Sequence, residues 1–94
     1  MGDYLVRDNA AEQRFELIAD GEVGALATYR ARDGVVRILH TETAREMRGR
    51  GLAGELARQA LDQIRERGER VIPSCPFFAK YIGEHPEHQD LLAP

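Results

Sequence analysis

A chain of 94 residues has the size of one small domain, with room for a single modest hydrophobic core. Its 16 acidic residues outnumber 13 basic ones, and the net charge of −3 with a pI of about 5.6 argues against a nucleic-acid-binding protein, which usually carries a basic surplus. Hydrophobic residues make up 43% of the chain, enough for a folded globular domain, but no stretch approaches the roughly 20 apolar residues of a membrane span.

The cysteine content and the N-terminus both indicate a cytoplasmic protein. Cys75 is the only cysteine, which excludes an intramolecular disulfide, and the Cys and His residues lack the spacing of a structural zinc site. The N-terminus has neither the basic segment nor the apolar run of a secretory signal. We therefore expect a protein of the reducing cytoplasm that binds no metal.

Residues 14–43 have the pattern of three antiparallel strands, and residues 4–6 are a candidate for a short strand before them. The polar groups at 20–22 and 32–34 separate the three strands, and each contains the glycine that a hairpin turn needs. Alternation along the third strand predicts two faces, with Val36, Ile38, His40 and Glu42 on one and Val35, Leu39, Thr41 and Thr43 on the other.

A long amphipathic helix is predicted to follow this strand. Apolar residues recur there at steps of three and four, namely Leu52, Leu56, Ala60, Leu61 and Ile64. Gly68 stands where a C-terminal cap belongs, residues 71–72 restart an extended segment, and residues 77–84 predict a short helix that ends before Pro86. The order of elements predicts one α/β (α+β) domain over residues 1–94, with a mostly antiparallel sheet and one long helix.

The turn between the third strand and this helix, Arg48-Gly49-Arg50-Gly51-Leu52-Ala53-Gly54, favours phosphate binding. A helix N-terminus offers unpaired N–H groups and a partial positive charge, and glycines let the backbone approach a phosphate closely. A P-loop would require Lys followed by Ser or Thr where Leu52 and Ala53 stand. The spacing of the glycines fits a dinucleotide-binding turn, but antiparallel strands precede it and the expected acidic residue at the end of the next strand is absent.

The Arg-x-x-Gly-x-Ala pattern at Arg48, Gly51 and Ala53 resembles the pyrophosphate loop of the GNAT superfamily of N-acetyltransferases. His-Thr-Glu at 40–42, Pro-Ser-Cys-Pro-Phe at 73–77 and His-Pro-Glu at 85–87 are similar to the short, single-domain branch of that superfamily with a Cys-Pro-Phe motif. The resemblance covers roughly residues 14–92 and implies a minimal GNAT-like fold with acetyl-CoA as cofactor. The implied function is acetyl transfer to an amine, and the alternative is a non-catalytic CoA-binding module.

The resemblance also implies which residues form the site. Backbone groups of residues 42–44 would pair with the pantetheine arm of the cofactor. The site would therefore include Thr43 and Ala44. The pyrophosphate would be held by Arg48, Gly49, Arg50, Gly51, Leu52, Ala53 and Gly54. Three side chains are candidates for catalysis: Glu42 as a base if burial favours its neutral form, Cys75 as a proton donor or acetyl acceptor, and Tyr81 as a general acid.

Each candidate has a structural alternative. Cys75 and Tyr81 have the character of core residues, Glu42 that of a solvated or ion-paired group, and His40, His85 and His88 that of structural residues.

The chain lacks the helical segment that usually shapes the acceptor pocket between the first two strands in that superfamily. An open acceptor site is therefore expected, or one completed by a second copy in a homodimer or by the acceptor itself. Three classes of acceptor stay open: a small amine, a protein lysine and a protein N-terminus. An interaction domain that binds an acidic partner through Arg45, Arg48 and Arg50 is a third function consistent with the sequence.

Overall fold

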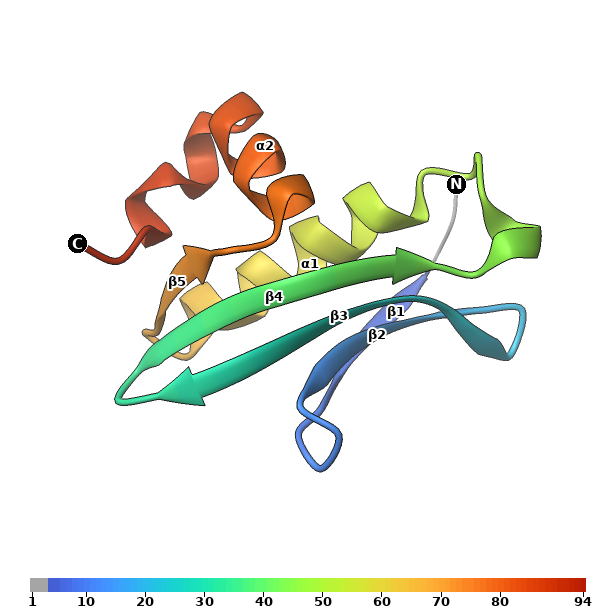
Figure 1. The fold of residues 1–94 in the computed structure, drawn as a ribbon, viewed down its shortest axis with the longest axis horizontal. Helices are drawn as coiled ribbons and strands as arrows, with labels where there is room; N and C mark the ends of the chain where they lie inside the picture. Colours follow the sequence, from blue (N-terminus) through green and yellow to red (C-terminus); the bar gives the residue numbers. More distant parts are fainter. Residues whose placement is uncertain (1–3) are drawn as a thin grey trace.

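A computed structural model describes residues 4–94 and contains one five-stranded sheet in the order β1-β2-β3-β4-β5 (Figure 1). The elements along the chain are β1 (Leu5–Asn9), β2 (Arg14–Ala19), β3 (Glu22–Arg32), β4 (Val35–Thr43), the 3-10 helix η1 (Arg45–Met47), α1 (Leu52–Glu66), β5 (Arg70–Pro73), α2 (Pro76–Glu84) and the 3-10 helix η2 (Pro86–Leu91). No helix in this described part of the chain has the length and apolar character to cross a bilayer.

Strands β2, β3 and β4 form the predicted antiparallel meander, β1 adds a fourth antiparallel strand beside β2, and β5 joins β4 in parallel after the α1 crossover. The β2–β3 and β3–β4 hairpins close in tight two-residue turns, because Asp20-Gly21 and Asp33-Gly34 all adopt the positive φ values that such turns require. The predicted fold class is thus confirmed. The candidate strand at residues 4–6 is found as β1, which begins at Leu5 and extends to Asn9, where it pairs with Arg14 of β2.

The hydrophobic core lies between one face of the sheet and α1. The predicted apolar stripe is confirmed, since Leu52, Leu56, Ala60, Leu61 and Ile64 are all buried. Phe78 and Ile82 of α2 belong to the same cluster of buried residues as the sheet residues Phe15, Leu17 and Ile38. The opposite face of the sheet carries no helix among the described residues and is mostly polar.

A β-bulge in β4 reverses the predicted faces of the second half of that strand. Ile38 pairs with Tyr29 but His40 pairs with Thr28, so Leu39 is an extra residue on β4. Beyond it, Thr41 and Thr43 pair with the buried Ala27 and Ala25 and face the core. His40 and Glu42 therefore lie on the open face, and the prediction that they share a face with Val36 and Ile38 is wrong, because simple alternation assumes that no residue is inserted.

A second irregularity, at Gly24 of β3, lets α1 approach the sheet. The register shifts between Leu17 and Ile18, which leaves Gly24 without a partner on β2. A Cβ at Gly24 would lie 2.9 Å from both Leu52 Cδ1 and Met47 Sδ. Glycine at this position allows the first residue of α1 to pack directly on β3, and so it positions the loop that precedes the helix.

Strands β4 and β5 separate after Ile38. Their pairing ends at Ile38 and Pro73, followed by one further bond from the Cys75 N–H to the Ile38 carbonyl at 2.9 Å. The Ala44 N–H bonds to Gly24 of β3 at 2.8 Å, so by alternation the peptide groups of Thr41 and Thr43 point away from β3. The second half of β4 consequently presents a free edge on the side where β5 has diverged.

Candidate functional site

A cleft of about 250 Å³ lies between the N-terminus of α1, the end of β4 and the start of α2. It is lined by Thr43, Arg48, Gly49, Gly51, Leu52, Ala53, Gly54 and Phe77. All of these except Phe77 were predicted to contact a cofactor. Phe77 belongs to the Cys-Pro-Phe motif, and its partly exposed side chain in the lining of the cleft makes it a further candidate for ligand contact.

The floor of the cleft offers backbone hydrogen-bond donors. Gly51 precedes α1 with φ of 73°, and the first helical hydrogen bond runs from the Glu55 N–H to the Gly51 carbonyl at 3.2 Å. The N–H groups of residues 52–54 have no acceptor within the helix, and no side chain caps it. A Cβ at Gly49, Gly51 or Gly54 would meet no atom within 4 Å, so open space lies beside these donors. An anion fits here sterically and electrostatically.

The two arginines of the loop have different environments. Arg48 lines the cleft, and no carboxylate of residues 4–94 lies within ion-pair distance of it. Arg50 donates hydrogen bonds to the Asp20 carboxylate and the Tyr4 hydroxyl, each at 3.0 Å, and these bonds raise its pKa. Sequence reasoning missed these two partners of Arg50, because Asp20 and Tyr4 are distant from it in sequence.

The two residues predicted at the end of β4 also differ. Thr43 lines the cleft and turns its peptide group toward the free edge of the strand. Ala44 uses its N–H to bind the Gly24 carbonyl, and its own carbonyl accepts from Met47 at 2.9 Å. The backbone groups available for a ligand are therefore those of Thr41 and Thr43 rather than of Ala44.

Cys75 lies where β4 and β5 separate. It is the N-cap residue of α2, it is 3% exposed, and its Sγ lies 3.2 Å from Thr41 Oγ1. Sequence reasoning did not single out Thr41, because only the bulge at Leu39 turns this hydroxyl toward the thiol. The pair places a polar contact at the apex of the opening between the two strands.

The other two candidate catalytic residues lie apart from this thiol. The Glu42 side chain is 62% exposed on the open face, and its carboxylate is 2.9 Å from His40 Nε2. The role of Glu42 as a base was predicted on the condition that its side chain is buried, and the structure does not meet this condition.

Tyr81 is stacked on His85, with ring centroids 3.9 Å apart. Burial, followed by the charge of Glu87, raises the pKa of Tyr81. No hydrogen bond within residues 4–94 joins its hydroxyl to Cys75.

Residues 14–91 match the family described as GCN5-related N-acetyltransferase. NATD1 proteins of Mus musculus and Homo sapiens are 39% identical over 57 residues, which cover 61% of this chain and 52% and 50% of those proteins. The chain thus spans about half the length of these curated relatives.

Two solved structures show the same fold. A GCN5-like protein from Staphylococcus aureus superimposes with a TM-score of 0.71 at 24% identity, covering 99% of this chain and 91% of that protein. The ribosomal-protein-S18-alanine N-acetyltransferase of Escherichia coli gives a TM-score of 0.57 at 19% identity, over 76% of this chain and 42% of that enzyme. With the family match over most of its length, this chain belongs to the GCN5-related N-acetyltransferases.

Proposed function

We propose that this chain binds acetyl-CoA in the cleft at the N-terminus of α1 and transfers the acetyl group to an amine. The observation that carries the proposal is the cleft itself, which joins free N–H donors, Arg48 and open space beside three glycines. Thr43 lines this cleft and also belongs to the free edge of β4. One continuous surface therefore suits a pyrophosphate at one end and an amide-containing arm along the strand.

The residues divide into groups by the part of the cofactor that each fits. The N–H groups of residues 52–54 and the Arg48 guanidinium suit the pyrophosphate charge. The peptide groups of Thr41 and Thr43 suit the amides of the arm. Phe77 offers an apolar wall to the same cleft.

Bound acetyl-CoA supplies an activated acetyl group: the acceptor nitrogen bonds to the carbonyl carbon, the carbon–sulfur bond breaks, and CoA leaves as a thiol after taking up a proton. Cys75 is our candidate for donating that proton, because its thiol lies at the apex of the opening and the Thr41 hydroxyl fixes its position. The amine must also lose a proton. The exposed His40–Glu42 pair is our candidate for accepting it, directly or through water, from the open face.

One observation favours the alternative of a CoA-binding module without transferase activity. Cys75 is 3% exposed, and Glu42 lies on the other face of the sheet. Tyr81 stacks on His85. No hydrogen bond joins any two of the three candidate catalytic side chains in the described part of the chain, so binding without turnover is consistent with the geometry.

Mass spectrometry separates these two functions. Purified protein would be incubated with acetyl-CoA and measured under native and denaturing conditions, which reports bound cofactor, any acetyl-cysteine and any homodimer. Transfer would then be measured as CoA thiol release with polyamines, aminoglycosides, and lysine or N-terminal peptides. We expect a bound cofactor and release of CoA with one class of amine. Binding without release across the panel would favour the non-catalytic module, and absence of binding would contradict both.

A further inference from the structure

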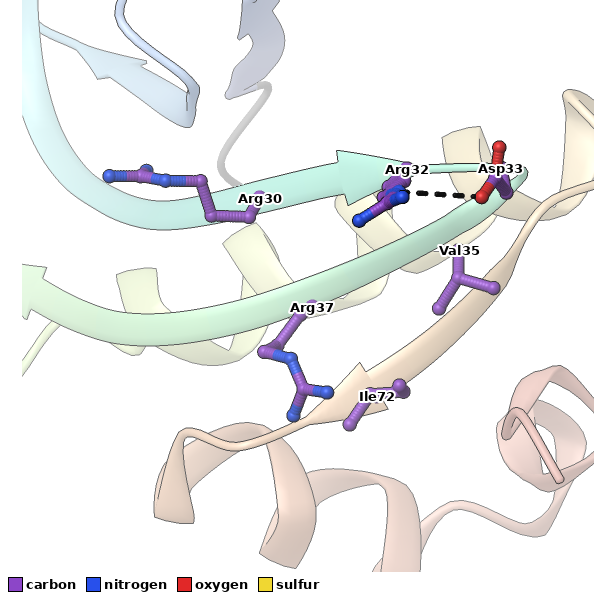
Figure 2. A pocket seen from close by; sticks show the side chains of 6 residues that line it. All are labelled: Arg30, Arg32, Asp33, Val35, Arg37 and Ile72. Carbon is purple, nitrogen blue, oxygen red and sulfur yellow. Dashed lines mark ion pairs between the residues drawn. The ribbon is translucent and has the colours of Figure 1, made fainter.

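A second cleft lies on the open face of the sheet, where β3, β4 and β5 run side by side. It has a volume of about 420 Å³ and is lined by Arg30, Arg32, Asp33, Val35, Arg37 and Ile72. Figure 2 shows the Arg37 side chain extending from β4 toward β5, where it lies beside Ile72. The cleft is on the face opposite α1, because its β4 residues alternate with the buried Val36 and Ile38.

This cleft concentrates positive charge. Arg30 and Arg37 are direct partners across β3 and β4, and like charges in that arrangement destabilise a strand pair. Within residues 4–94, no carboxylate lies within ion-pair distance of either one. Their guanidinium groups donate instead to neutral oxygens, the Tyr29 carbonyl at 3.1 Å and the Ser74 hydroxyl at 3.0 Å. Both retain donors for a further acceptor, because a guanidinium has five N–H groups.

The same face shows how the chain neutralises arginines elsewhere. Arg7 and Arg14 lie on β1 and β2, and both bind the buried carboxylate of Glu16, at 2.8 and 2.6 Å. In the cleft the only carboxylate is Asp33, which lies 3.5 Å from Arg32 with both side chains almost fully exposed. A pair at that exposure contributes little. The cleft therefore keeps a local positive charge in a chain whose net charge is −3.

The cleft also adjoins the opening between β4 and β5. Arg37 directly precedes Ile38, whose carbonyl accepts from the Cys75 N–H, and the Arg37 guanidinium reaches Ser74. A molecule held by Arg37 thus lies next to the residues at the apex of the opening, on the face that α1 does not cover.

We propose that this cleft binds an anionic group carried by the acceptor, a carboxylate or a phosphate close to the reacting amine. The inference rests on the proposed function, because it assigns the acceptor side of the same site. Guanidinium groups form paired, charge-assisted hydrogen bonds with both kinds of anion. Such a cleft favours an acidic peptide or another anion-bearing amine and disfavours a polyamine.

Three short peptides with a free N-terminus test this inference: Ala-Glu-Glu-Trp-amide, its uncharged counterpart Ala-Gln-Gln-Trp-amide, and a version with phosphoserine in place of the glutamates. The chain contains no tryptophan, so the fluorescence anisotropy of the peptide tryptophan reports binding directly. Each peptide would be titrated with CoA-loaded wild type, with the double variant Arg30→Gln and Arg37→Gln, and with Lys80→Gln, which removes one positive charge from the exposed surface of α2. Thermal unfolding verifies that each variant is folded.

We expect an anionic peptide to bind wild type at least about tenfold more tightly than the glutamine peptide. The double variant should lose this preference and Lys80→Gln should keep it, and acetyl transfer should follow the same order. Which anionic peptide binds more tightly distinguishes carboxylate from phosphate. Equal affinity for charged and uncharged peptides, or a preference that survives in the double variant, would overturn the inference. A separate CoA titration keeps the two proposals distinct, since failure to bind CoA contradicts the proposed function and the acceptor role together.

Discussion

Replacing Gly54 with alanine should stabilise the protein and weaken cofactor binding at the same time. Gly54 is the third residue of α1 and has no positive φ, so alanine can adopt its conformation. Its Cβ would meet no protein atom within 4 Å. Glycine within a helix costs about 0.5–1 kcal/mol relative to alanine, which for a domain of this size corresponds to a rise in Tm of roughly 2–8 °C.

The same methyl group would stand in the cleft. The Cβ of a helical residue tilts toward the helix N-terminus, which here is the donor-lined end of the cleft that Gly54 itself lines. Keeping a phosphate away from two or three charge-assisted N–H bonds should weaken CoA binding about tenfold or more, equivalent to about 1.4 kcal/mol. The two effects have opposite signs, so loss of binding cannot be ascribed to unfolding.

Isothermal titration with CoA and thermal unfolding measure the two effects. Gly83→Ala is the matched control, because Gly83 also lies within a helix, its Cβ would also meet open space, and it does not line the cleft. It should raise Tm without changing CoA affinity. If Gly54→Ala raises Tm and binds CoA as tightly as wild type, the pyrophosphate does not lie at the N-terminus of α1.

Three further predictions concern single side chains. Arg48→Gln should weaken CoA binding about five- to tenfold and reduce its salt dependence, whereas Arg50→Gln should leave the affinity unchanged, because Asp20 and Tyr4 already bind that guanidinium; equal effects in a titration would contradict the different positions of the two arginines. Cys75→Ala should lower stability by about 1 kcal/mol, keep CoA affinity within a few-fold and slow transfer about 100-fold; turnover at the wild-type rate would show that another proton donor, such as a water molecule, serves the leaving CoA. Burial alone would raise the pKa of Glu16, but hydrogen bonds from arginines and an asparagine lower it to about 2, below its ordinary value of 4.5. Its ionised form therefore stabilises the fold above pH 4.5, and this contribution is lost as the pH falls toward 2. Glu16→Gln should lower the free energy of unfolding by about 1–2 kcal/mol at neutral pH, a value limited by the exposed position of the arginines. Denaturant unfolding should also show a weaker dependence of this free energy on pH between pH 4.5 and 2. A variant with the wild-type pH profile would show that another group is responsible.

Local signals made the fold predictable. The hairpins at Asp20-Gly21 and Asp33-Gly34 depend on turn residues that are adjacent in sequence, and a long stripe of apolar residues predicts α1. The glycine-rich turn before α1 was predictable for the same reason, since its glycines and the helix that follows them are contiguous.

Two features of the site depend on geometry that periodicity does not encode. The bulge at Leu39 changes which residues of β4 face the core, and it brings Thr41 rather than Glu42 to Cys75. The ion pair of Arg50 depends on Asp20, a residue of another turn that approaches only when the sheet forms. Alternation and spacing describe one element at a time, so they could not predict contacts between elements.

The extra residue at Leu39 makes the polar pair on β4 dependent on the bulge. If the nine residues of β4 paired with strict alternation, His40 and Glu42 would face the apolar layer beneath α1, where an ionised carboxylate costs several kcal/mol. Deleting Leu39 would place Ile38 directly before His40, so the strand could pair regularly with both side chains still on the open face. A one-residue deletion should therefore be tolerated at the bulge, whereas elsewhere in β4 it would reverse the face of every residue that follows.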